Sequence, residues 1–156
     1  MIAKVFTPPN RIFFLFLSLL AYSGIVAQSG PVNSKKGLAL QGYDAVSYFQ
    51  EKPLKGSSEI STEFEGHRYL FSSAENKDLF EANPKKYLPQ YGGYCAYAMA
   101  LKGSKVPINP MTYEIRGDKL YLFYNKGKNN TLEFWLKQGP QELVVQADDH
   151  WKAHLK

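Results

Sequence analysis

Cysteine is almost absent from this chain, which has only Cys95 in 156 residues. A single cysteine excludes an internal disulfide framework, so the fold must be held together by its core. A basic stripe is also absent, because the lysines and arginines are scattered along the sequence, and we expect no nucleic-acid partner. The sequence contains no Gly-rich phosphate loop, Ser-His-Asp set or pair of carboxylates that would indicate a catalytic centre.

Only one long apolar run occurs, and it lies at the N-terminus. Lys4 and Arg11 precede it without any acidic residue, and residues 12–26 are predominantly apolar. This pattern predicts a secretory signal peptide over residues 1–27, and the run is shorter than the roughly 20 residues of a spanning helix. The alternative is an uncleaved membrane anchor. We expect cleavage, an exported protein in the periplasm or outside the cell, and no membrane attachment afterwards.

The remaining chain divides into a short lead-in and one domain. Residues 28–36 are polar with Gly and Pro, which predicts a flexible lead-in, and residues 37–156 form a single domain. Removal of Lys4 and Arg11 leaves 17 basic residues against 14 acidic ones, a net charge of +3. Aromatic residues make up 15% of the sequence, enough to build a core.

The local patterns predict an α+β fold, with a small antiparallel sheet of hairpins packed by short helices. Asp44 is placed to cap one helical turn, and Ser72 with Glu75 fits a capping box that opens a helix ended by Pro84. The other expected elements are hairpins over 61–71, with its turn at 65–68, and 112–124, with its turn at 116–119, and helices over 129–137 and 141–155. The two hairpins suggest one shared sheet.

The most distinctive stretch is Tyr91-Gly-Gly-Tyr-Cys-Ala-Tyr-Ala-Met99. Its Gly-Gly pair allows positive φ or close backbone approach, which suits a sharp bend before a packed segment. Cys95 is either a small buried hydrophobe or a thiol in a formed pocket. Tyrosine rings combine apolar area with a hydroxyl, and Asp44 and Cys95 add polar or reactive groups. The candidate ligand-binding residues are therefore Tyr43, Asp44, Tyr48, Tyr91, Tyr94, Cys95 and Tyr97. The alternatives are core tyrosines with satisfied hydroxyls and an Asp44 used only as a cap.

Three segments resemble the small exported members of the YHS-domain family: residues 42–49 (GYDAVSYF), 69–87 and 91–98 (YGGYCAYA). Residues 117–122 and the region of Trp151 also look like this subgroup, so the resemblance runs from about residue 36 to 151. It implies a metal-linked function, because metal-handling members carry cysteines in the first two segments. Those cysteines align with Ser47, Ser72 and Asn76, which are far weaker ligands for soft metal ions than thiolates.

Three functional hypotheses remain. A copper or other transition-metal ion would use Cys95 with Asp44 and His67, or His150 with His154 at i, i+4. A Cys-dependent enzyme would need a base beside Cys95, and His67 lies in a distant hairpin turn. A non-catalytic binding module would take a small ligand or a protein partner in a tyrosine-lined pocket around Cys95. We expect an exported, non-catalytic YHS-type binding module, with a metal-linked role as the leading specific hypothesis.

Overall fold

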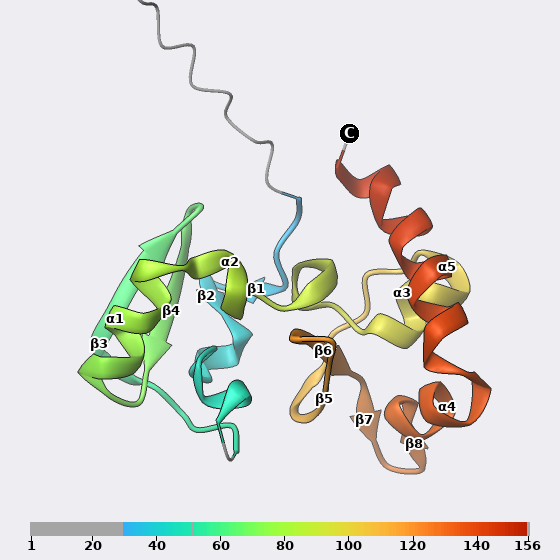
Figure 1. Ribbon diagram of the computed structural model, residues 1–156, viewed down its shortest axis with the longest axis horizontal. Helices are drawn as coiled ribbons and strands as arrows, with labels where there is room; N and C mark the ends of the chain where they lie inside the picture. Colours follow the sequence, from blue (N-terminus) through green and yellow to red (C-terminus); the bar gives the residue numbers. More distant parts are fainter. Residues whose placement is uncertain (1–29, 51, 156) are drawn as a thin grey trace, which may run out of the picture.

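The computed structural model describes residues 30–50 and 52–155, so the predicted signal peptide over residues 1–27 lies outside the described part. Figure 1 shows a β3–β4–α1 unit on one side and the helices α3, α4 and α5 on the other, with α2 between them. Short helices and small, mostly antiparallel sheets confirm the predicted α+β class. Within the described residues, no helix is long and apolar enough to cross a membrane.

The first sheet has four strands in the order β1-β2-β4-β3. Its strands are β1 (Ser34–Lys35), β2 (Leu38–Ala39), β3 (Ser57–Phe64) and β4 (His67–Phe71). β3 and β4 form the expected hairpin, but its two-residue loop is Glu65-Gly66, both with positive φ. The predicted turn was therefore one residue too late, because a two-residue hairpin loop needs positive φ at both positions, and His67 and Arg68 already belong to β4.

Helix α1 (Ala74–Ala82) covers one face of this hairpin. The buried Phe80 ring contacts Tyr69 and Phe71 of β4 and Phe64 of β3. The N-cap is Ser73, whose hydroxyl accepts the Asn76 N–H. The predicted capping box beginning at Ser72 was wrong, because the Ser72 hydroxyl is bonded to the distant Asp44 carboxylate.

Helix α1 ends at Ala82 with Asn83 as its C-cap, and Pro84 begins the short helix α2 (Pro84–Tyr87) at its first position. The helix therefore stops just before Pro84, which agrees with the expectation that Pro84 ends it, and Pro84 takes the first position of the next helix. This fits the preference of proline for the first helical turn, where its missing N–H leaves no bond unmade.

The Gly-Gly pair lies in the 3₁₀ turn η3 (Gln90–Gly93) and has positive φ at both glycines. The N-terminal segment packs directly on it. The Asn33 N–H donates to the Gly92 carbonyl at 2.8 Å, and the Asn33 side-chain amide donates to the Gly93 carbonyl at 2.9 Å. A Cβ at Gly92 would lie 2.0 Å from the Pro31 carbonyl oxygen. Over its described part, the predicted flexible lead-in is therefore a docked segment that continues into β1.

The second hairpin, β5 (Asn109–Arg116) with β6 (Lys119–Phe123), forms a separate two-stranded sheet. Its turn falls at Gly117-Asp118, as expected. The expectation of one sheet shared by both hairpins was wrong. The free side of β6 is occupied by the central stretch, through parallel bridges from Pro89 to Leu120 and from Cys95 to Leu122.

The C-terminal part contains α3 (Ala96–Lys102), a β7–β8 hairpin (Asn125–Lys126, Asn129–Asn130), α4 (Thr131–Gln138) and α5 (Pro140–Lys152), which continues into a 3₁₀ turn, η4 (Ala153–Leu155). Pro140 occupies the first turn of α5, as predicted. A second core cluster forms here around the fully buried Trp135, whose indole N–H donates to Glu114 at 2.9 Å. The first cluster lies between the four-stranded sheet, α1 and β6.

We expect Gly92→Ala to destabilise the protein by about 3 kcal/mol or more, because the new methyl group combines unfavourable positive φ with a backbone clash. Gly127→Ala is the matched control, since Gly127 also has positive φ but has no atom within 4 Å of an added Cβ. Its expected loss is about 1 kcal/mol. Urea unfolding of both variants measures the difference, and equal losses would show that the docked N-terminal segment does not constrain Gly92.

Candidate functional site

The side chain with the densest hydrogen bonding is Asp44, which is fully buried. It lies between the turn η1 (Leu40–Gly42) and the turn η2 (Ser47–Phe49). One carboxylate oxygen, Oδ1, accepts the backbone N–H groups of Val46 and Ser47 at 2.9 and 3.3 Å. Asp44 thus caps the turn that leads into η2, as expected from the sequence, while the N-cap of η2 itself is Val46 and has no side-chain cap bond.

The second oxygen of Asp44, Oδ2, binds groups that are distant in the sequence. It accepts the Ser72 N–H at 2.9 Å, the Ser72 hydroxyl at 2.6 Å and the Asn76 side-chain amide at 2.7 Å. Ser72 follows β4 and Asn76 lies in the first turn of α1, so one carboxylate joins three elements. Five donors surround a group with about four lone-pair sites, which leaves the carboxylate saturated.

Ser47 completes what we call the Asp44 cluster: Asp44, Ser47, Ser72 and Asn76. The Ser47 hydroxyl donates to the Asp44 backbone carbonyl at 2.7 Å and accepts the Leu54 N–H at 2.9 Å. Gln50 donates to the Asn76 side-chain oxygen at 2.9 Å. The three positions that align with family cysteines therefore converge in space around one carboxylate. The sequence did carry a signal for this convergence, because residues that align with the ligands of one metal site are expected to lie close together. Sequence reasoning did not use it to predict the cluster.

Cys95 is fully buried at the N-cap of α3. Its Sγ lies 3.3 Å from the Thr131 hydroxyl oxygen. That hydroxyl donates its single proton to the Tyr124 carbonyl at 2.8 Å, so the thiol must be the donor to Thr131. The thiol is therefore enclosed and hydrogen-bonded, and no histidine of the described residues is bonded to it.

The proposed metal ligands Cys95, Asp44 and His67 lie on three different elements. His67 begins β4, opposite Phe64, and its Nδ1 is the one buried side-chain nitrogen or oxygen without a partner among the described residues. In residues 30–50 and 52–155, no three His, Cys, Asp or Glu side chains gather in a way that would hold a metal ion. The structure does not bring these three candidates together.

His150 and His154 each bind a carbonyl near the C-terminal end of α3. His150 Nδ1 lies 2.9 Å from the Met99 carbonyl oxygen, and His154 Nε2 lies 2.9 Å from the Gly103 carbonyl oxygen. The Met99 carbonyl also accepts the Gly103 N–H at 2.9 Å, so His150 adds a second bond to it. Histidine side chains commonly bind carbonyls at helix C-termini. Both rings thus hold α3 against the C-terminal segment.

The buried candidate tyrosines belong to different core clusters. The Tyr48 hydroxyl donates to the Pro110 carbonyl at 2.9 Å in the first cluster, and burial raises the Tyr48 pKa well above its usual value. The Tyr91 hydroxyl donates to Asp148 at 2.9 Å in the second cluster. Burial first, and then this bond, raise the Tyr91 pKa. Both hydroxyls are satisfied within the protein.

The half-buried candidate tyrosines also point to separate places. Lys55 lies over the Tyr43 ring at 5.7 Å, the Tyr94 hydroxyl donates to the Val32 carbonyl at 3.4 Å, and the Tyr97 hydroxyl accepts the Gln138 amide at 2.7 Å. Tyr91, Tyr94, Tyr97 and Cys95, like Tyr43, Asp44 and Tyr48, line neither the small cavity beside Tyr69 nor the open groove beside the four-stranded sheet.

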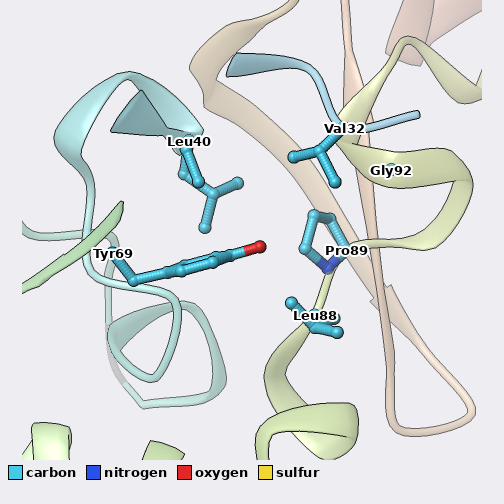
Figure 2. Close-up of a pocket in the computed structure, with 7 residues that line it drawn as sticks. Val32, Leu40, Tyr69, Leu88, Pro89 and Gly92 are labelled. Atoms are coloured by element: carbon cyan, nitrogen blue, oxygen red, sulfur yellow. The ribbon is translucent and has the colours of Figure 1, made fainter. Parts of the chain in front are cut away.

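A small cavity does open elsewhere, beside a tyrosine that the sequence had indicated only as a strand residue. Tyr69 of β4 points its hydroxyl into this cavity, toward Pro89 (Figure 2). The remaining lining residues are Val32, Ala39, Leu40, Leu88 and Gly92. Sequence reasoning missed Tyr69 because its alternation with Phe71 is the ordinary pattern of a core strand.

Comparison with known proteins gives one match. Residues 45–91 match the family described as YHS domain, a segment that includes Ser47, Ser72 and Asn76 but covers less than half of the chain. No curated protein and no solved structure gives a significant match. The match over residues 45–91 supports the YHS domain family for this chain.

Proposed function

We propose that this chain is an exported, non-catalytic binding module of YHS type, in which the family's metal-handling position serves as a structural hydrogen-bond cluster. The observation that carries the proposal is the Asp44 cluster. Three positions that hold thiols in metal-handling relatives converge there, but here they supply hydroxyl and amide groups. The metal-linked role implied by the family does not extend to this position.

The chemistry of the cluster supports this interpretation. Soft ions such as Cu(I) select thiolate ligands, and neutral hydroxyl or amide oxygens bind them weakly. A cation at Asp44 would also have to displace N–H and O–H donors that already point at the carboxylate. Removal of donors from a buried carboxylate is expensive, since hydrogen bonds to charged groups contribute roughly 1.5–3 kcal/mol each.

A non-catalytic role is supported by the environment of Cys95. A cysteine nucleophile needs a base within hydrogen-bond reach and access for the substrate. Cys95 has no exposed surface, and its thiol donates to Thr131. The arrangement favours a packing role for this thiol within the first core cluster.

The alternative function is the binding of a small ligand or a protein partner. Two recesses that do not include Cys95 are the candidate places for it. An open groove beside the four-stranded sheet is lined by charged side chains of both signs, among them Lys35, Lys36, Arg68 and Glu63. The cavity beside Tyr69 offers a second, mostly apolar recess. Binding by this module is therefore proposed to use one of these recesses rather than a tyrosine pocket around Cys95.

Export is tested by expressing the full chain in a Gram-negative host and determining the N-terminus of the periplasmic product. We expect a mature chain that begins at Gln28. Leu17→Arg should block processing, because a charge interrupts the apolar run of the signal. A wild-type product that keeps Met1 and stays in the cytoplasm would contradict export, and a membrane-bound product would indicate an anchor.

Asp44→Asn should destabilise the protein by about 3 kcal/mol or more. The new amide places an N–H against donors and removes the charge that they stabilise. Asp78→Asn makes the same chemical change on the exposed face of α1 and should stay within about 0.5 kcal/mol of wild type. Denaturant unfolding compares the two, and similar small losses in both variants would show that the Asp44 cluster is not structural.

Metal binding is tested by titrating the mature chain with Cu(I) and Zn(II) against a competing chelator. We expect no stoichiometric binding by wild type. The variant Ser47→Cys/Ser72→Cys/Asn76→Cys restores the family thiols around Asp44, and we expect it to bind one Cu(I) per chain.

A wild-type chain that binds Cu(I) as tightly as the triple variant would overturn the proposal. Cys95→Ser in the wild-type background then shows whether Cys95 supplies the ligand. Circular dichroism of each variant checks that the fold is retained before the titrations are compared.

A further inference from the structure

The cavity beside Tyr69 lies where the first half of the chain meets the central stretch. Its inner wall consists of the buried residues Ala39, Leu40 and Tyr69. Its outer wall consists of half-buried residues, namely Val32, Leu88, Pro89 and Gly92. Figure 2 shows the Tyr69 ring extending between Leu40 and Leu88, with its hydroxyl at the far end toward Pro89. The hydroxyl is the one side-chain polar group among the lining residues.

The Tyr69 hydroxyl needs an acceptor that the surrounding protein does not supply. The residue is 2% exposed, yet no hydrogen bond joins its hydroxyl to another group of the described residues. The oxygen is not enclosed by packed atoms, because His67 Nδ1 is the one fully enclosed, unpartnered side-chain nitrogen or oxygen in that part of the chain. It therefore faces the open space of the cavity.

Two carbonyl groups of the lining residues already accept backbone donors. The Gly92 carbonyl accepts the Asn33 N–H at 2.8 Å, and the Val32 carbonyl accepts the Ser34 N–H at 2.8 Å. Burial, with a smaller contribution from the charge of Glu65, raises the Tyr69 pKa to about 12. The phenol thus remains a protonated donor at neutral pH. The hydroxyl faces the cavity without a protein acceptor, so an acceptor that enters the cavity would complete its hydrogen bonding.

We propose that this cavity binds a small, neutral molecule that carries one hydrogen-bond acceptor, which the Tyr69 hydroxyl holds. The inference names a ligand class for the binding module and so rests on the proposed function. Neutrality follows from the lining, in which no residue is charged and most are apolar. A single acceptor follows from the single side-chain donor.

The size of the cavity limits the ligand further. Its volume of about 40 Å³ exceeds the roughly 10–15 Å³ that one water molecule requires. It is far smaller than the roughly 300–1,000 Å³ of ordinary ligand pockets. A molecule of a few heavy atoms, such as a short ketone or alcohol, matches this space. Cofactors, nucleotides and sugars are too large.

The test compares two probes of the same shape by two-dimensional ¹⁵N NMR of the mature chain. Acetone carries an acceptor oxygen, and 2-methylpropene replaces that oxygen with an apolar CH₂ group. We expect saturable acetone shifts confined to amides of the lining residues, Val32, Ala39, Leu40, Tyr69, Leu88 and Gly92. Wild type should bind acetone more tightly than 2-methylpropene.

Tyr69→Phe removes the hydroxyl and keeps the ring against Phe80. We expect this variant to bind acetone about fivefold more weakly, the typical effect of one neutral hydrogen bond, and to bind 2-methylpropene as wild type does. Val32→Phe places a ring at the mouth of the cavity, and it should abolish binding of both probes. Val32 is half-buried, so this variant is expected to fold.

Three results would overturn the inference. They are shifts that do not saturate, shifts that lie outside the cavity, and equal binding of both probes by wild type. Shifts that do not saturate are also the result expected if an ordered water molecule alone accepts the hydrogen bond of the Tyr69 hydroxyl. No residue of the Asp44 cluster lines the cavity. The acetone titration therefore tests the cavity, and the Cu(I) titration tests the proposed function, independently of each other.

Discussion

The fold depends on the buried carboxylate of Asp44 and the five donors that surround it. A charge inside a protein is tolerated only where hydrogen bonds replace its lost hydration. Here these bonds come from the turn η2, from the end of β4 and from the first turn of α1. One side chain therefore fixes how the N-terminal turns meet the β3–β4 hairpin and its covering helix. A substitution of Asp44 therefore acts on three elements together.

The Gly92-Gly93 backbone imposes the second constraint, because the segment 30–33 approaches it too closely for a side chain at Gly92. Val32 of that segment also forms part of the wall of the Tyr69 cavity, and Gly92 forms another part. The same close approach that docks the N-terminal segment therefore leaves a recess rather than a filled core. The shape of this recess depends on the docking of residues 30–33, since Val32 of the segment lines it.

Features set by local sequence were predictable, and features set by distant contacts were not. The α+β class, both hairpins, the cap at Asp44 and the start of α5 at Pro140 follow from spacing and turn residues. The true N-cap Ser73 was not predictable, because it depends on Ser72 being bonded to a residue 28 positions away. The separation of the two hairpins depends on bridges from Pro89 and Cys95 to β6. For the same reason, residue types alone did not show that the candidate tyrosines lie apart.

The Asp44 cluster shows how one geometry can serve opposite electrostatic needs. Thiolates at the three positions would add negative charge beside a carboxylate, and such a set requires a cation for stability. A hydroxyl at Ser72 and an amide at Asn76 instead donate hydrogen bonds to the carboxylate, so its charge is stabilised by neutral donors. The neutral Ser47 hydroxyl adds no charge, and it donates to the backbone carbonyl of Asp44 rather than to the carboxylate. Hydrogen bonds to Asp44 therefore hold η2, β4 and α1 together in this structure.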